Sequence, residues 1–247
     1  GAVGTDWRTG LEGHNPTVAA ASFGLALLAR DQDNSRPATV SSSLAPGQSQ
    51  RYEDVLGAVF GFTGSGALRL DAGSGTVVAT SRTYNTTPDG TYGQFIGGVP
   101  EGRSIVGGEE ARIIQLTHTG ASGSGSRTNL GMLSCVPFQT TVEVGLYRST
   151  GEHLGTRSYT LAPYSFRQVD RIFEQVTATA VADGYAVVRP LTSGGRLFAY
   201  ASVVDNRTGD PVYVPAQRVG AAVATPTPTA TSPGATATPT RTPTRTP

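Results

Sequence analysis

The sequence predicts an all-β protein made of two tandem antiparallel β-sandwich domains of similar topology, followed by an extended Thr/Pro-rich C-terminal tail. Its 247 residues include 32 glycines and only 7% aromatic side chains, a composition that favours many short strands joined by turns. An internal duplication favours two domains of ordinary size over one large domain. We expect a first β-sandwich at 1–100, a second at 101–215 with its leading strand and Gly/Ser loop, and a strand-like segment with the tail at 216–247.

The duplication is clearest in a hairpin that occurs at 77–96 and again at 198–215. The two sequences are V-V-A-T-S-R-T-Y-N-T-T-P-D-G-T-Y-G-Q-F-I and F-A-Y-A-S-V-V-D-N-R-T-G-D-P-V-Y-V-P. In each, a run of small and β-branched residues leads through a Gly-bearing polar turn to a second aromatic and aliphatic run. That pattern is typical of a β-hairpin.

The other predicted elements recur in the same order in both halves. Each half has an entering strand, a strand with period-two alternation, a third strand that ends in Leu-Ala-Pro, one or two helical turns and a further strand. The corresponding segments lie at 7–11 and 126–130, 23–27 and 142–146, 44–46 and 161–163, 52–56 and 169–173, and 67–70 and 186–189.

One predicted strand has no counterpart in the first half. Residues 111–118 precede the second repeat and read as a strand with Ile114 and Leu116 on one face, whereas only residues 1–6 precede the first repeat. If both repeats share one plan, the first repeat exposes an unpaired strand edge, which proteins ordinarily either protect or use. After the second repeat, residues 218–224 continue as an extended segment of small residues.

Three strings carry a family resemblance: R-T-x-L, then L-A-P, then A-Y-A-S-V-V-D-N-R-T-G-D-P-V-Y-V-P. Together they resemble an uncharacterised tandem β-sandwich module repeated in secreted and cell-surface bacterial proteins. The resemblance implies the fold and an extracellular or cell-surface location, but no site, because the family carries no agreed activity. The tail is similar to the Thr/Pro linkers of bacterial secreted proteins, and residues such as Thr227 and Thr229 suit O-glycosylation or a simple spacer.

These features suggest an extracellular structural protein that assembles with copies of itself. The segment after Pro215, with Arg218, Val219, Ala221 and Val223 as donor residues, is predicted to add as a strand to the first sandwich of the next copy. A head-to-tail contact between copies that does not close into a ring produces a filament or tube.

The alternative is a carbohydrate-binding or adhesive module of a larger secreted surface protein. In that case glycans or a cell-surface polymer are the partners. The exposed aromatic candidates for stacking on sugars are Tyr84, Tyr92, Tyr200 and Tyr213.

Other function classes find no support in the sequence. The net charge is +1 and no basic face is visible, so we expect no nucleic-acid partner. The longest mostly apolar run, 18–29, is shorter than the about 20 residues that span a bilayer, so we expect no membrane span. No clustered catalytic groups or metal-ligand spacings occur, which predicts a non-enzyme without a cofactor. Cys135 is expected to be a small buried side chain and not a reactive thiol.

Two weaker sites involve the hairpin turns. Asp205, Asn206 and Asp210 offer oxygen ligands for calcium, but D-N-R-T-G-D does not match a calcium loop and suits a turn, which is the preferred interpretation. Asn85 and Asn206 begin glycosylation sequons, both placed in the turn, where Asn is also explained by turn geometry.

Equivalent charges in the two repeats suggest structural salt bridges. Arg8 is predicted to pair with Glu53, and Arg127 with Asp170.

Overall fold

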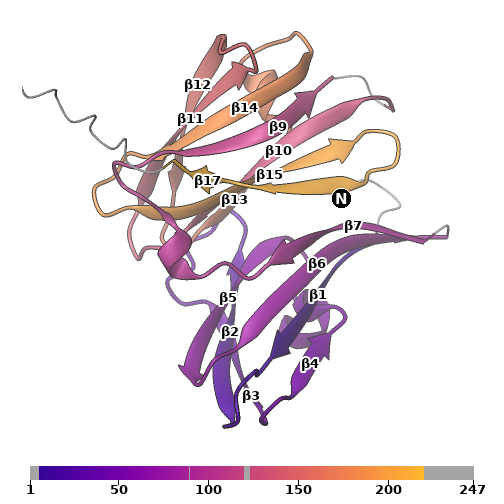
Figure 1. The fold of residues 1–247 in the computed structure, drawn as a ribbon, viewed down its shortest axis with the longest axis vertical. Helices are drawn as coiled ribbons and strands as arrows, with labels where there is room; N and C mark the ends of the chain where they lie inside the picture. Colours follow the sequence, from indigo (N-terminus) through magenta and orange to yellow (C-terminus); the bar gives the residue numbers. More distant parts are fainter. Residues whose placement is uncertain (1–5, 89, 120–122, 220–247) are drawn as a thin grey trace, which may run out of the picture.

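The structure is a computed structural model that describes residues 6–88, 90–119 and 123–219. It confirms the all-β class: four antiparallel sheets account for the fold, with only three short helical turns among the described residues. Figure 1 shows two groups of sheets, one formed by strands β1 to β7 and the other by strands β8 to β17.

The first group consists of two sheets around one core. One sheet has the strand order β4-β1-β6-β7 and the other β3-β2-β5. The elements are β1 (Asp6–His14), β2 (Ala21–Ala29), β3 (Ala38–Leu44), β4 (Ser49–Tyr52), η1 (Val55–Val59), β5 (Gly66–Ser74), β6 (Val78–Thr87) and β7 (Gly90–Gly97). Both sheets and η1 contribute to the core, through Leu11, Phe23, Leu25, Leu44 and Val55.

The second group repeats this arrangement and adds strands to it. Its sheets have the orders β13-β10-β15-β16, with β8 also pairing with β15, and β12-β11-β14-β9-β17. The elements are η2 (Glu101–Arg103), β8 (Ile105–Val106), β9 (Ala111–His118), β10 (Ser126–Ser134), β11 (Thr140–Arg148), β12 (His153–Leu161), β13 (Phe166–Val169), η3 (Ile172–Gln175), β14 (Val181–Pro190), β15 (Arg196–Asp205), β16 (Pro211–Pro215) and β17 (Gln217–Arg218).

The strand orders confirm the predicted elements of both halves. β4-β1-β6-β7 corresponds to β13-β10-β15-β16, and β3-β2-β5 corresponds to β12-β11-β14. The two predicted hairpins are β6–β7 and β15–β16, and the predicted helical turns are η1 and η3. The fold is therefore β-sandwich-like, as the alternation of apolar residues indicated.

Strand β9 forms as predicted, but the expectation that Ile114 and Leu116 share a face is wrong. Leu116 is fully buried whereas Ile114 is 49% exposed. The reason is a β-bulge: the register against β14 shifts between Ile113 and Leu116, and Gln115 adopts a positive φ of 61°. The extra residue reverses the alternation, so that Ile113 and Leu116 face the core together.

The predicted pairing of Arg8 with Glu53 is also wrong. The guanidinium of Arg8 lies 3.0 Å from Asp6 and 3.9 Å from Asp54, while Glu53 pairs with Arg51. Glu53 and Asp54 lie in the bend between β4 and η1, where Asp54 is the N-cap of η1, and it is this second carboxylate that lies near Arg8.

The equivalent pairing of Arg127 with Asp170 is not formed either. Arg127 donates a hydrogen bond to the side-chain oxygen of Asn206 at 2.9 Å. Asp170 instead lies 3.8 Å from Arg30, which comes from the first group. The acidic residue therefore serves the contact between the two groups.

The loop after β2 joins the two groups of sheets. Arg30 forms an isolated parallel bridge with Phe166 of β13, and the backbone N–H of Asp31 donates to the Phe166 carbonyl at 2.7 Å. The backbone N–H of Asn34 donates to the Pro163 carbonyl at 2.9 Å. Asn34 is only 5% exposed, and its side-chain amide donates to the Tyr164 carbonyl at 3.1 Å. This loop therefore fixes the first group against the free edge of β13.

Candidate functional site

The second group shows how this fold closes its core. β9 pairs with the edge of β14, with Ile113 opposite Ala186 and Ala111 opposite Val188. All four side chains are fully buried. Phe173 of η3 belongs to the same core and is fully buried too.

The first group lacks such a closing strand among the residues that the structure describes. β5 corresponds to β14 and pairs with β2 on one side, but no described strand pairs with its other edge. Figure 1 shows β5 at the border of the lower group, without a neighbour of the kind that β9 provides for β14. A row of backbone donors and acceptors along β5 is therefore available to another strand.

The core beneath this edge is incompletely covered. Leu68 and Leu70 of β5 pack against the core but stay partly exposed, and so do three apolar side chains of η1 and its C-terminal cap, Leu56, Val59 and Phe60. In the second group Phe173, the equivalent of Leu56, and the β14 residues Ala186 and Val188, which take the places of Leu68 and Leu70, are fully buried. We call these five residues, together with the free edge of β5, the acceptor groove.

The sequence indicated an open edge in the first half but not these groove residues. The signal was present in the pattern, because Leu68 and Leu70 are spaced for one face of a strand that no other predicted strand covers. What the pattern did not indicate is that Leu56 and Phe60 of η1 and its C-terminal cap pack, partly exposed, against the same core as Leu68 and Leu70.

Two of the predicted donor residues lie on their own second group. Arg218 belongs to β17, which pairs with β9 opposite Ala111, and the N–H of Val219 donates to the Glu110 carbonyl at 3.1 Å. The guanidinium of Arg218 lies 2.5 Å from Glu109 and holds the pKa of that carboxyl below its usual range. The chain is thus anchored as far as Val219, and the other donor residues, Ala221 and Val223, lie outside the described residues.

The possible calcium ligands form a turn. One carboxylate oxygen of Asp205 accepts hydrogen bonds from the backbone N–H groups of Arg207 and Thr208, and these bonds lower its pKa. The side chain of Asn206 donates to the Ser124 carbonyl. Asp210 is exposed, and no metal-binding group of three or more His, Cys, Asp or Glu side chains occurs in the described part of the chain. The geometry supports the turn interpretation.

The sequon asparagines are both engaged in the fold. Asn85 lies in β6 opposite Tyr92, not in the turn as predicted, and is 8% exposed. Its side-chain oxygen accepts the backbone N–H of Asp6 at 2.8 Å. Asn206 is half-buried and contacts Arg127. The proposed O-glycosylation residues Thr227 and Thr229 lie outside the described residues.

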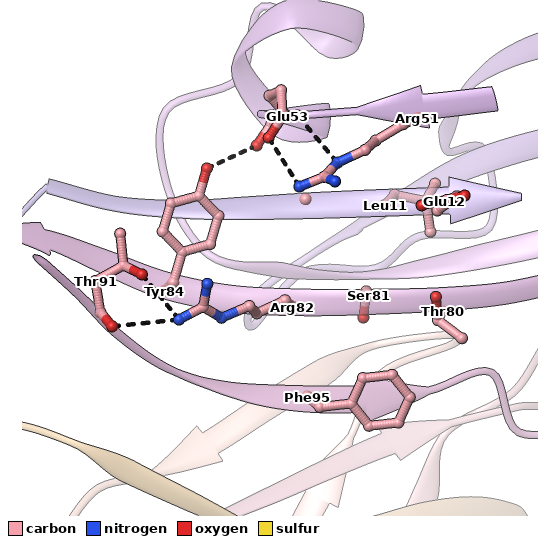
Figure 2. Close-up of a pocket in the computed structure, with 11 residues that line it drawn as sticks. Leu11, Glu12, Arg51, Glu53, Thr80, Ser81, Arg82, Tyr84, Thr91 and Phe95 are labelled. Carbon is pink, nitrogen blue, oxygen red and sulfur yellow. Dashed lines mark hydrogen bonds and ion pairs between the residues drawn. The ribbon is translucent and has the colours of Figure 1, made fainter.

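A shallow pocket of about 400 Å³ lies on the outer face of the sheet β4-β1-β6-β7 (Figure 2). Its sides carry Arg82, which donates to the Thr91 carbonyl and hydroxyl, and Tyr84, whose hydroxyl donates to the Glu53 carbonyl. Phe95 is 63% exposed at one end of the pocket. This combination of an exposed ring, hydroxyls and paired charges suits a neutral polar ligand.

The four tyrosines predicted as sugar-stacking candidates are therefore not equivalent. Tyr84 lines the pocket, but Arg82 lies over its ring at 5.2 Å. Tyr200 and Tyr213 pack against one another with ring centroids 5.1 Å apart, and burial raises the pKa of Tyr200 to about 12. Tyr92 is half-buried in β7 and is not among the lining residues of the pocket.

Cys135 is a half-buried free cysteine. Burial raises the pKa of its thiol to about 12, so the reactive thiolate is scarce at neutral pH. The side chain is therefore a structural one, as expected.

His118 is a buried titratable residue of the closing strand β9. It ends β9, is 3% exposed, and its Nε2 atom lies 3.3 Å from the Glu174 carboxylate. Its Nδ1 atom has no hydrogen-bond partner among the described residues. Burial lowers the pKa of the imidazole, against the opposing effect of Glu174.

We expect the second group to lose stability as the pH falls from 7 to 5.5. Because the folded-state pKa of His118 is lowered, the unfolded chain binds more protons once the pH drops below about 6.5, the ordinary value of histidine. The free energy of unfolding measured in urea should decrease over this window, and His118→Gln should flatten the decrease. An equal slope in both proteins would show that other groups dominate.

Comparison with known proteins adds no relationship: no protein-family model and no curated protein matches the chain. The described part of the chain contains no helix that is both long and apolar enough to cross a membrane.

Proposed function

We propose that this chain is an extracellular structural protein made of two tandem β-sandwich domains, and that copies of it assemble head to tail by strand donation. The C-terminal segment of one copy adds to the acceptor groove of the first sandwich of the next copy. The observation that carries the proposal is the contrast between two equivalent strands: β14 is closed by β9, whereas β5 has no partner on its outer edge among the described residues.

The contrast matters because strand addition satisfies two needs together. The backbone groups of β5 gain hydrogen bonds, and alternate side chains of the added strand cover Leu68 and Leu70. An exposed edge with an apolar inner face is otherwise a site of uncontrolled association. On the outer face of β5, Arg69 and Asp71 form a 2.9 Å ion pair that keeps that face polar.

The donor suggested here is the segment that follows Val219. It leaves the second sandwich from the edge of β9, where residues 217–219 are already paired in the strand direction. A donor on the second sandwich and an acceptor on the first make a heterologous contact, which propagates unless it closes into a ring.

The extracellular location and the absence of catalysis are part of the proposal. The location rests on the Thr/Pro-rich sequence at 225–247, which has ten Thr and six Pro, and on the family resemblance. The non-catalytic role is consistent with a groove that is lined by aliphatic and aromatic side chains and offers backbone groups instead of acid–base pairs.

Two truncations test the proposal. A chain ending at Val219 keeps every paired residue of β17 but removes the donor, so we expect monomers by sedimentation and no filaments by electron microscopy. A chain ending at Ala224 keeps the donor and removes only the Thr/Pro tail, so it should still assemble. Long filaments formed by the shorter chain would rule out donation by this segment.

The pocket in Figure 2 supports a second candidate function, the binding of a neutral saccharide by a larger surface protein. The exposed ring of Phe95 and the hydroxyls of Thr80 and Thr91 are the groups that would contact it. Binding on a glycan array that is lost in Phe95→Ala would favour this function over assembly.

A further inference from the structure

We infer that Val223 is the side chain that fills the acceptor groove, and that it fixes a single register of the donated strand. In this register Ala221 lies opposite Leu70, Ala222 opposite Arg69 and Val223 opposite Leu68 of a second copy of the chain. The inference rests on the proposed function and specifies its contact.

The template for the register is the closing strand of the second sandwich. β9 runs antiparallel to β14 and places Ala111 opposite Val188, Arg112 opposite Val187 and Ile113 opposite Ala186. A small residue and, two positions later, a branched aliphatic residue thus face the core. Both are fully buried there.

The pairing of β5 with β2, compared with the pairing of β14 with β11, shows which residues of β5 and β14 are equivalent. In the first sandwich Leu25 pairs with Leu70 and Leu27 with Leu68. In the second, the equivalent residues of β11 pair in the same way, Val144 with Val188 and Leu146 with Ala186. Leu70 therefore corresponds to Val188, and Leu68 to Ala186.

The sequence of the donor offers one side chain for this groove. Between residues 220 and 247, Val223 is the only aliphatic side chain larger than that of alanine. Ala221 and Val223 repeat the spacing of Ala111 and Ile113, a small residue followed two positions later by a branched one. Pro226 has no backbone N–H, so the paired segment ends before it.

The volumes of the facing pairs are also complementary. In the second sandwich a large Ile113 faces a small Ala186. In the proposed contact a smaller Val223 faces a larger Leu68, so each pair combines a larger and a smaller side chain, and the larger one comes from β5 instead of the added strand. A shift of one residue turns Val223 away from the core, and a shift of two places either Ala221 or Thr225 opposite Leu68.

Disulfide trapping tests the register on the outer side of the ladder, where Arg69 is half-buried and its guanidinium lies over the ring of Tyr164 at 5.2 Å. In a Cys135→Ala background, Arg69→Cys combined with Ala222→Cys should give a ladder of covalent multimers on mild oxidation. Arg69→Cys combined with Ala224→Cys is the matched control, because Ala224 faces the same side but lies two positions away. It should give at least tenfold less cross-linked material.

The outcomes separate the register from the proposed function. Multimers only in the Ala224→Cys protein, or filaments that cross-link in neither protein, would overturn the register while leaving assembly intact. A cross-linked monomer would show that the segment binds its own first sandwich. The absence of filaments in the parent protein would instead contradict the proposed function.

Substitutions of Val223 test the same contact independently, through the critical concentration for assembly. Val223→Ser should raise the critical concentration for assembly about tenfold or more, whereas Val223→Ile should change it by less than about threefold. Val219→Ser is the matched control, because Val219 is 44% exposed on its own second sandwich. Equal effects of the two serine substitutions would contradict the assigned role of Val223.

Discussion

Phe173→Ala is expected to lower the free energy of unfolding by about 3–5 kcal/mol, the cost of a large cavity in a packed core. Phe173 is fully buried in the core of the second group, beneath the sheet that β9 completes. The neighbouring side chains come from η3 and from both sheets, so the site cannot collapse to fill the space. Urea denaturation followed by circular dichroism measures the loss.

Leu56→Ala is the matched variant in the first group, since Leu56 of η1 takes the place of Phe173 of η3. Because Leu56 is partly exposed at the acceptor groove, we expect a loss of less than half that of Phe173→Ala in the unassembled chain. If copies assemble as proposed, the groove is covered in the assembled material, and the loss measured there should be larger. An equally large loss in the unassembled chain would mean that the groove is already closed.

Asn34→Ala is expected to loosen the contact between the two groups of sheets and to cost about 1–3 kcal/mol, because buried polar groups lose their partners. Besides its bond to Tyr164, the Asn34 side chain accepts the Ala29 N–H and donates to the Ala29 carbonyl, both at 3.0 Å. Hydrogen exchange of the Asp31 and Asn34 amides reports the contact, because both donate to the second group. Both amides should exchange faster in the variant.

Asn15→Ala provides the control for this prediction. Asn15 is fully buried and its side-chain amide donates to the carbonyls of Ala19, Leu44 and Ala45, all within the first group. The substitution should destabilise the first group to a similar extent without changing the exchange of the Asp31 and Asn34 amides. Faster exchange in both variants would mean that global opening, and not the contact, is being measured.

The extent to which the sequence predicts this protein depends on the range of the interactions involved. Alternating residues such as Phe23, Leu25 and Leu27 predict their strand correctly, because side chains in a strand face alternate sides whatever the partner is. The prediction for Ile114 is wrong, because the bulge at Gln115 follows from the register against β14. A local pattern does not contain that register.

The features of the candidate site also fall into those that the sequence predicts and those that only the structure shows. The sequence predicts the strand at 111–118, which has no counterpart between 6 and 100, and an extended segment at 218–224. The groove residues of η1, and the pairing of Arg218 and Val219 with β9, are not visible. They depend on which strands become neighbours, and that is decided by contacts between residues far apart in the chain.

The sequence by itself determined the all-β class, the order of the strands and helical turns, and the position of the hairpins, because each follows from alternation and turn chemistry within a few residues. Only the tertiary structure decided that, among the described residues, no strand pairs with the outer edge of β5 over its partly covered core, whereas β9 pairs with β14. Both strands carry apolar residues at their equivalent core-facing positions, Leu68 and Leu70 in β5 and Ala186 and Val188 in β14. They differ because burial and backbone pairing are properties of the neighbouring strand, which no single segment of sequence specifies.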